Sequence, residues 1–236
     1  MLNKGKPFLL LSAMQQELDA VVQNMSEHHQ YEKYGITIVE GTIFGRHCVA
    51  AMSGVGKVAA AFTSQLLMEV YSPKAVIFTG VGGALNPEYE IGDIVVAKDC
   101  VQHDIDGRGL GFKRGEVPYA GIRYFNSDTD LLNLANGTDC RHRIHEGRIL
   151  TGDQFITNKE QEAFMYMKEE FHGDCVDMEG AAVAYVSQKH QIPFILVRTI
   201  SDKANNEAPE SFEAFLPEVA ENSVAVIQHI IVNSPY

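Results

Sequence analysis

The chain repeats a pattern in which a short apolar run is followed by a turn of small residues and then by a longer stretch with helical spacing. This alternation is typical of strand-helix units. Several apolar runs are unbroken series of Val, Ile and Leu, which indicates strands covered by helices on both faces. The predicted strands are residues 8–12, 36–43, 47–52, 75–79, 93–99, 148–151, 174–178 and 194–200.

Helical spacing fills much of the remaining sequence. The predicted helices are residues 15–25, 57–71, 127–136, 159–170, 180–190 and 211–232. Residues 31–52 are typical of a hairpin or meander, so the sheet is expected to be mixed. No linker, low-complexity segment or internal repeat divides the chain. We therefore predict an α/β fold, a three-layer single domain over residues 1–236 with a mixed central β-sheet flanked by helices. Two long irregular stretches, 103–124 and 203–210, are candidates for lids or subunit contacts.

Composition and charge narrow the class of ligand. Of the 236 residues, 45% are hydrophobic and 21% charged, as in ordinary globular proteins. Lys and Arg total 19 against 31 Asp and Glu, and the net charge of -12 disfavours a nucleic-acid partner. The densest basic stretch, residues 141–145, is short and is followed by Glu146. A small-molecule ligand is therefore expected.

The cysteines and the apolar runs indicate the compartment. The four cysteines lie far apart and form no C-x-x-C pair of the kind found in zinc or redox sites. The apolar run 8–11 is too short for the core of a signal peptide. Nothing later approaches the ~20 apolar residues that span a bilayer. We expect a cytoplasmic protein with reduced thiols and no membrane partner.

Three acidic residues share one local context, because each lies at or just past the C-terminal end of a predicted strand. They are Glu17, Glu179 and Asp202. Ligands of open α/β sheets bind beyond the carboxyl ends of the strands, so these carboxylates converge on one cleft if their strands run parallel. Each one alone is also explained as an acid that complements a helix dipole. The three together favour a catalytic site.

Two glycine-rich segments follow predicted strands. Residues 53–59 loosely fit the dinucleotide fingerprint, but the next predicted strand ends at Gly80 without an acid for a ribose. Val58 stands where a P-loop has Ser or Thr, so we reject both nucleotide-cofactor sites. Residues 80–84 are expected to form either a tight turn or a place where a flat ring approaches the backbone closely.

The histidines show no spacing typical of a metal site. His28, His29, His142 and His145 are interpreted as surface residues. The pair His103-Asp104 opens the long segment 103–124 and has two interpretations, a contribution to a site or subunit contact, and a hydrogen-bonded structural pair. No G-x-S-x-G motif is present, which argues against an acyl-transfer hydrolase.

An ordered set of motifs spans nearly the whole chain. The motifs are SAMQQE at 12–17, SGVGKVAAA at 53–61, GDIVV at 92–96, TGDQFI at 151–156, VDMEGAA at 176–182 and RTISD at 198–202. The set closely resembles the 5'-methylthioadenosine/S-adenosylhomocysteine nucleosidases, a family of the nucleoside phosphorylase/hydrolase superfamily. This resemblance implies a nucleoside phosphorylase-like fold. It also implies hydrolysis of the bond between adenine N9 and a thio-substituted ribose, without a metal or organic cofactor.

The resemblance also implies a role for each acid. Asp202 matches the acid that protonates purine N7, and Ser201 orients its carboxyl group. Glu17 matches the base that activates water, and Glu179 matches the carboxylate that holds the ribose 2'- and 3'-hydroxyls. Such roles fit cleavage through an oxocarbenium-like state. Because Asp202 must be protonated when it acts, we expect its pKa to be raised in a dry pocket.

Further site residues follow from the same matching. The resemblance implies that Phe155 stacks on adenine and that the Ile156 backbone hydrogen-bonds the edge of the base. The positions that match the sugar and alkylthio pocket are Met14, Val55, Met178 and Phe212. The family is typically a homodimer in which a loop of the neighbouring subunit closes the site. Leu110 and Pro118 match that loop.

Two positions depart from the family pattern. Leu110 stands where an aromatic residue is more usual, which leaves the preferred 5'-substituent open. Val81 stands where a small hydroxyl residue or alanine is more usual, so a side-chain hydroxyl near the nucleophilic water is absent. Positioning of that water is then expected to fall to Glu17 and to an arginine, for which Arg198 is the candidate.

Three other functions compete with this one. A purine nucleoside phosphorylase needs arginines near the strand ends and a hydroxyl donor in the glycine segment, whereas residues 54–57 carry only Lys57. A nucleosidase for aminodeoxyfutalosine or another 5'-substituted adenosine is not distinguished by the sequence. A non-catalytic nucleoside-binding protein has no need of an acid and a base on opposite sides of a glycosidic bond.

Overall fold

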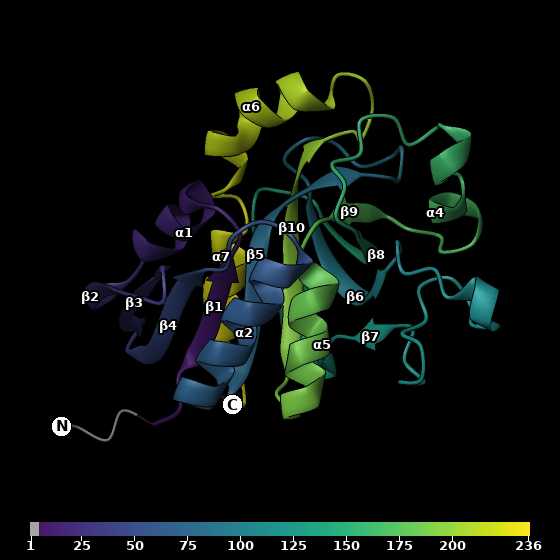
Figure 1. Ribbon diagram of the computed structural model, residues 1–236. Coiled ribbons are helices and arrows are strands. Elements are labelled where there is room, and N and C mark those ends of the chain that lie inside the picture. The colour runs from purple at the N-terminus through teal and green to yellow at the C-terminus, as the bar shows by residue number, and fades with distance from the viewer. Residues whose placement is uncertain (1–4) are drawn as a thin grey trace.

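The computed structural model describes residues 5–236, and a ten-stranded sheet runs through them (Figure 1). The strands are β1 (Phe8–Ser12), β2 (Ser26–Lys33), β3 (Ile36–Ile43), β4 (Arg46–Met52), β5 (Ala75–Ala84), β6 (Ile94–Gln102), β7 (Phe125–Asn126), β8 (Ile144–Thr151), β9 (Cys175–Asp177) and β10 (Phe194–Asp202). The helices are α1 (Gln15–Val22), α2 (Lys57–Tyr71), α3 (Thr129–Asn136), α4 (Tyr166–Glu169), α5 (Gly180–His190), α6 (Ala208–Val219) and α7 (Val224–Asn233). Single 3-10 turns lie at Arg108–Leu110 (η1) and Glu162–Phe164 (η2).

Both faces of the sheet are apolar, and a layer of helices covers each face. Leu9 and Leu11 of β1 pack in one core with side chains of α2 and α5. Phe8 and Leu10, which point to the opposite face, pack in a second core with side chains of α1, α3 and α7. The unbroken apolar runs of the central strands therefore arise from burial on two sides, and the predicted three-layer architecture is confirmed.

Five strands close on themselves. β5 pairs with β10, β10 with β6, β6 with β8, β8 with β9, and β9 again with β5. The pairs β10–β6 and β9–β5 are antiparallel, and the other three pairs are parallel. On its other edge β5 pairs with β1, which leads to β4, β3 and β2. The predicted mixed sheet is confirmed, but local periodicity does not predict the closed ring.

β5 extends through the glycine-rich segment 80–84. Of the two alternatives expected for this segment the tight turn is therefore wrong, because these residues pair with β10 and β9 as extended backbone. The glycines instead allow neighbouring groups to approach. A Cβ atom at Gly82 would lie 2.9 Å from the Val176 carbonyl oxygen, and one at Gly83 would lie 2.9 Å from Asp202 Oδ1. The absent side chains make room for β9 and for the end of β10.

Two predicted helices are divided in the structure. Residues 159–170 form only η2 and the single turn α4, and residues 211–232 belong to two helices, α6 and α7. Between α6 and α7, Asn222 Nδ2 donates to the Gly92 carbonyl, and the Ser223 and Thr79 hydroxyls pair at 2.7 Å. These polar contacts fix the chain at the break. No helix among residues 5–236 is long and apolar enough to cross a membrane.

The meander predicted for residues 31–52 is confirmed by the antiparallel pairing of β2 with β3 and of β3 with β4. β2 begins earlier than the apolar pattern indicates, at Ser26. Its sequence, SEHHQYEK, is polar and almost fully exposed, so it carries no apolar alternation. A polar strand at the edge of a sheet discourages pairing with other chains.

The close approach at Gly82 generates a stability prediction. Gly82→Ala is expected to lower the free energy of unfolding by about 1–3 kcal/mol, because the new methyl group overlaps Cys175 Sγ and the Val176 carbonyl oxygen. Urea unfolding measures the change. Gly109→Ala is the matched control, since a Cβ atom there meets no heavy atom within 4 Å. Equal stability of the two variants would contradict the overlap.

Candidate active site

A cavity of about 290 Å³ lies where β1, β5 and β10 end. This is the edge of the sheet at which α/β proteins bind ligands. Ten of the thirteen site residues expected from the sequence line it. They are Met14, Glu17, Val55, Phe155, Ile156, Met178, Glu179, Ser201, Asp202 and Phe212. The other lining residues are Ala13, Val81, Gly82, Gly83, Gln154, Val176 and Asp177.

The three acids approach the cavity from strands of different direction. β1 and β10 run parallel to β5 on its two edges, so Glu17 and Asp202 arrive at the same end of the sheet. β9, which precedes Glu179, runs antiparallel to β5 and pairs with Gly83 and Ala84 at its end. Parallel direction is therefore the wrong explanation for Glu179. The closed ring of strands brings it to the cavity.

Glu17 lies in the first turn of α1, and its carboxylate turns back over the start of that helix. Oε2 accepts the N–H groups of Ala13 and Met14, both at 2.9 Å, and Oε1 accepts the Val81 N–H at 2.9 Å. The side chain thus satisfies free N–H groups as a helix-terminal acid does, but it is also buried and lines the cavity. Burial raises the pKa of Glu17 above its usual value, although Arg198 and the N–H donors oppose this.

Asp202 is the last residue of β10 and follows an irregularity in the register with β5. Its Oδ2 accepts the Ser201 hydroxyl at 2.9 Å, and its Oδ1 accepts the Ala204 N–H at 2.8 Å. Burial raises the pKa of Asp202, even though both donors and the charge of Lys159 favour the ionised form. A buried carboxyl group that is held by a hydroxyl and has a raised pKa is suited to carry a proton.

Glu179 lies just before α5 and reaches the glycine-rich turn that precedes α2. Its Oε1 accepts the Gly56 N–H at 2.8 Å. Gly56 has φ +91°, a conformation that favours glycine, so the turn presents its N–H to a carboxylate of the protein itself. Burial, together with the negative charge of Asp177, raises the pKa of Glu179 to about 7. The glycine-rich turn therefore holds one of the three acids in place.

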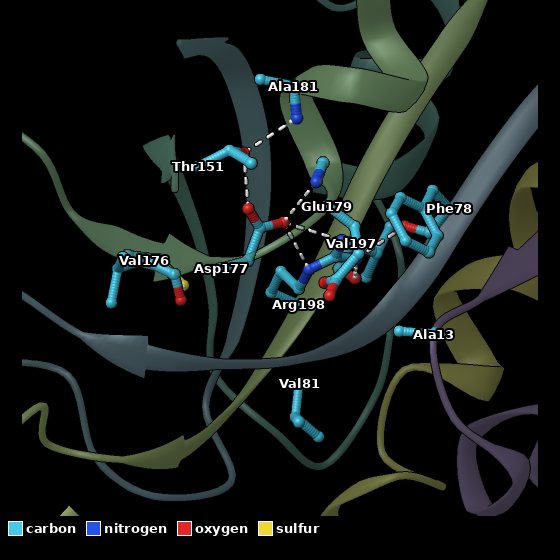
Figure 2. A network of polar contacts seen from close by, with 12 residues as sticks. Ala13, Phe78, Val81, Thr151, Val176, Asp177, Glu179, Ala181, Val197 and Arg198 are labelled. Atoms are coloured by element: carbon cyan, nitrogen blue, oxygen red, sulfur yellow. Dashed lines mark hydrogen bonds and ion pairs between the residues drawn. The ribbon is translucent and has the colours of Figure 1, made fainter. Parts of the chain in front are cut away.

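Arg198 is fully buried and paired with Asp177 (Figure 2). Its Nε donates to Asp177 Oδ2 at 3.0 Å, and Nη2 lies 2.8 Å from the same oxygen. Nη1 donates to the carbonyls of Phe78 and Val197, both at 3.1 Å, while the Thr151 hydroxyl donates to Asp177 Oδ1 at 2.5 Å. Arg198 is not among the residues that line the cavity. It acts on the acids through its charge, rather than through the contact with a water expected from the sequence.

Apolar side chains form the rest of the cavity wall. Phe155 and Phe212 meet edge to face, with ring centroids 5.6 Å apart, and Phe155 is 44% exposed. Ile156 beside them is buried, and Met14 and Val55 lie in the same lining. A mostly apolar wall with aromatic rings and a few polar groups is typical of a site for a flat organic ligand.

Besides Arg198, two expected site residues lie outside the lining of this cavity. Leu110 belongs to η1 and is 69% exposed, and Pro118 lies further along the segment 103–124. Neither belongs to the lining of the cavity in its own chain. Their contribution to the site of a neighbouring subunit stays a prediction.

Sequence reasoning missed some groups of the site. Asp177 had a usable signal, because it is a second carboxylate at the end of the strand that leads to Glu179. The N–H groups of Gly56 and Val81 had none, since main-chain donors are common to nearly all residue types. Among the described lining residues none is Lys, Arg or His, so the cavity favours a neutral or positively charged ligand over an anion.

Comparisons with known proteins agree with this geometry. The Phosphorylase superfamily model matches residues 7–232. A 5'-methylthioadenosine/S-adenosylhomocysteine nucleosidase of Staphylococcus haemolyticus is 32% identical over 94% of this chain and 97% of its own. Another, of Actinobacillus succinogenes, is 34% identical over 92% of this chain and 95% of its own.

Solved structures show the same likeness. The nucleosidase of that name from Neisseria meningitidis, in complex with methylthio-immucillin-A, has a TM-score of 0.89 at 29% identity, over 98% of this chain and 100% of its own. Futalosine hydrolase of Helicobacter pylori has a TM-score of 0.90 at 29% identity, over 96% of this chain and 97% of its own. This chain belongs to the phosphorylase superfamily and, within it, to the 5'-methylthioadenosine/S-adenosylhomocysteine nucleosidase family.

Proposed function

We propose that this protein hydrolyses the N-glycosidic bond of 5'-methylthioadenosine and S-adenosylhomocysteine and releases adenine. The observation that carries the proposal is the convergence of Glu17, Glu179 and Asp202, all buried, on one mostly apolar cavity. The names of the relatives support the choice of substrates.

Asp202 is the general acid of the proposed reaction. It gives its proton to N7 of adenine while the bond between N9 and C1' breaks, so that the bond electrons leave with a neutral base. The raised pKa of Asp202 supports this role because it favours the protonated carboxyl group before the reaction. The Ser201 hydroxyl, bonded to Oδ2, orients that group.

The other two acids act on the sugar side. Glu17 takes a proton from the water that attacks C1', and its three N–H donors support a fixed orientation of the carboxylate. Glu179 accepts hydrogen bonds from the ribose 2'- and 3'-hydroxyls. Negative charge on both groups also stabilises the cationic sugar of an oxocarbenium-like transition state.

The apolar wall binds the two ends of the nucleoside. Phe155 stacks on adenine, and the Ile156 backbone hydrogen-bonds the edge of the base. Side chains without charge receive the ribose and the alkylthio group. These are Met14, Val55, Met178 and Phe212, all of which line the cavity.

Hydrolysis is favoured over phosphorolysis by charge. A phosphorylase places basic side chains against its phosphate. The described lining of the cavity holds three acids of the proposed mechanism and a fourth carboxylate, Asp177, but no basic side chain. A phosphate dianion at this site would meet only negative side-chain charge.

A related nucleosidase activity is the second candidate. The likeness to futalosine hydrolase of Helicobacter pylori favours a 5'-substituted adenosine with another tail, such as aminodeoxyfutalosine. The proposed adenine and ribose contacts are the same for both activities. Only the tail end of the cavity distinguishes them.

The proposal extends to a cytoplasmic homodimer. Each subunit is a single nucleosidase domain over residues 1–236. Leu110 and Pro118 of one subunit close the alkylthio end of the partner's site. Apolar side chains exposed on the segment 103–124 and on α2 support such a contact, among them Tyr119 (86% exposed) and Val58 (84% exposed). The four free cysteines suit a reducing compartment. Sedimentation as a monomer at assay concentration would contradict the dimer.

Adenine release from a panel of 5'-substituted adenosines tests the reaction directly. In phosphate-free buffer the protein is expected to release adenine from 5'-methylthioadenosine and S-adenosylhomocysteine at the rate seen with added phosphate, because water is the nucleophile. Chromatographic detection of adenine measures both rates. A strict requirement for phosphate would contradict the hydrolase assignment. Activity on aminodeoxyfutalosine alone would favour the second candidate.

Asp202→Asn is expected to lower kcat by a factor on the order of 10²–10⁴, the usual contribution of a general acid. KM is expected to change little, since the amide keeps the shape of the carboxyl group. The control is Glu207→Gln, which alters an exposed carboxylate a few residues further along the chain. Steady-state adenine release measures both variants, and a kcat of Asp202→Asn within threefold of the wild type refutes the role of the acid.

Ser201→Ala is expected to move the basic limb of the pH profile of kcat/KM to higher pH. The Ser201 hydroxyl stabilises the ionised form of Asp202, so its loss raises the pKa of Asp202 further. An acid with a higher pKa keeps its proton to higher pH. The control is Ser187→Ala, a buried serine whose hydroxyl bonds only to a carbonyl of its own helix. A basic limb that stays in place or moves to lower pH contradicts the assignment of Asp202.

A further inference from the structure

A polar clamp outside the cavity joins three segments that are distant in the sequence. The clamp consists of Lys57, Asp104 and Asp153. Lys57 Nζ lies 2.6 Å from Asp104 Oδ1 and 3.5 Å from Asp153 Oδ2, and the Lys57 N–H donates to Asp153 Oδ1 at 3.0 Å. The Asp153 N–H donates to Asp104 Oδ2 at 3.0 Å. Each member is therefore bonded to both of the others.

Two members of the clamp adjoin residues that face the nucleoside. Lys57 follows Gly56, whose N–H holds Glu179 Oε1. Asp153 comes two residues before Phe155 and three before Ile156, the proposed adenine wall. No clamp residue belongs to the lining of the cavity. The clamp therefore acts on the nucleoside through the segments that it holds.

His103 packs against the same segment from the side of β6. A Cβ atom at Gly152 would lie 2.3 Å from His103 Nε2, so the imidazole fills the space that a side chain would need. The His103 Nδ1 atom lies 2.8 Å from the Tyr166 hydroxyl, which fixes the ring. Burial lowers the pKa of His103 to about 4, so the ring is neutral at neutral pH. His103 and Asp104 thus contact Gly152 and Asp153 as one unit.

We propose that Lys57 and Asp104, with His103 beside them, are positioning residues that hold the adenine- and ribose-binding segments in register and so set the affinity for the nucleoside. The inference rests on the function proposed above. It assigns the His103-Asp104 pair, which the sequence left between two interpretations, to support of the site.

The charged groups of the clamp are partly buried, so water weakens their attraction only in part. The Lys57 side chain is 16% exposed and that of Asp104 is 27% exposed, so solvent screens the pair less than it screens an ion pair on the open surface. Burial alone raises the pKa of Asp104, but the Lys57 ammonium and the Asp153 N–H outweigh it and hold the pKa below its usual value. Asp104 is therefore ionised at neutral pH.

Asp104→Asn tests the clamp, because it removes the charge and keeps the shape. The expected result is a rise on the order of tenfold in KM for 5'-methylthioadenosine and in the dissociation constant of adenine, because the adenine wall is displaced. kcat is expected to stay within about threefold of the wild-type value. The variant weakens binding of the substrate and of the transition state equally, and it removes no contact that is made only in the transition state. Adenine binding is measured by calorimetry on the full-length protein and needs no turnover.

The matched control is Asp106→Asn. Asp106 lies two residues away in the same segment and pairs with Arg108 and Arg114 outside the clamp. The Asp106→Asn variant is expected to keep KM and the adenine dissociation constant within about twofold of the wild-type values. Lys57→Met, the second test variant, removes the partner charge and keeps most of the aliphatic stem. Combined with Asp104→Asn it is expected to weaken adenine binding by less than the sum of the two single effects, because both changes break the pair of Lys57 with Asp104.

The outcomes separate this inference from the function on which it rests. Unchanged KM and adenine affinity in Asp104→Asn contradict the positioning role of the clamp. A lower kcat with unchanged KM contradicts it as well. If the wild type releases no adenine but binds it, and Asp104→Asn weakens that binding, the clamp stands and the proposed reaction falls. A wild type that neither releases nor binds adenine overturns both.

Discussion

A buried arginine offsets part of the negative charge at the cavity end of the sheet. Arg198 lies next to Asp177 and is near enough to Glu17 and Glu179 for its charge to lower their pKa values. A buried ion is stable only when it is paired, and Arg198 directs Nε to Asp177 and Nη1 to two main-chain carbonyls. Arg198 carries one positive charge beside the carboxyl groups of Glu17, Asp177 and Glu179, so buried carboxyl groups outnumber buried cations there. Burial then keeps the pKa values of Glu17 and Glu179 above their usual range, which makes Glu17, the proposed base, a stronger proton acceptor.

β5 supports this cluster by lacking side chains where the acids approach. A Cβ atom at Gly80 would lie 2.7 Å from Glu17 Oε1, and one at Gly83 would lie 2.9 Å from Asp202 Oδ1. Glycine in a strand costs about 0.5–1 kcal/mol relative to alanine. The strand accepts that cost because two buried carboxylates then lie against its backbone.

The site is assembled from segments that are far apart in the chain. The ring of strands brings the end of β9 to the end of β5, and the clamp of Lys57, Asp104 and Asp153 ties together segments beside the cavity. Both arrangements position main-chain groups, such as the Gly56 N–H, which holds Glu179. Such donors fix the carboxylates, whose negative charge stabilises the cationic sugar in the proposed reaction.

Local sequence was enough to predict β1, β3, α2 and α5 with the bounds that the structure has, because each combines clear apolar periodicity with a recognisable start or end. The position of the three acids at predicted strand ends also identified them, whereas the apolar lining was implied by the resemblance to the nucleosidase family. Tertiary structure alone decided that β9 runs antiparallel to β5, that residues 80–84 are strand, and that Arg198 pairs with Asp177. These features depend on which distant segments meet, and a period of two or 3.6 residues carries no information about such partners.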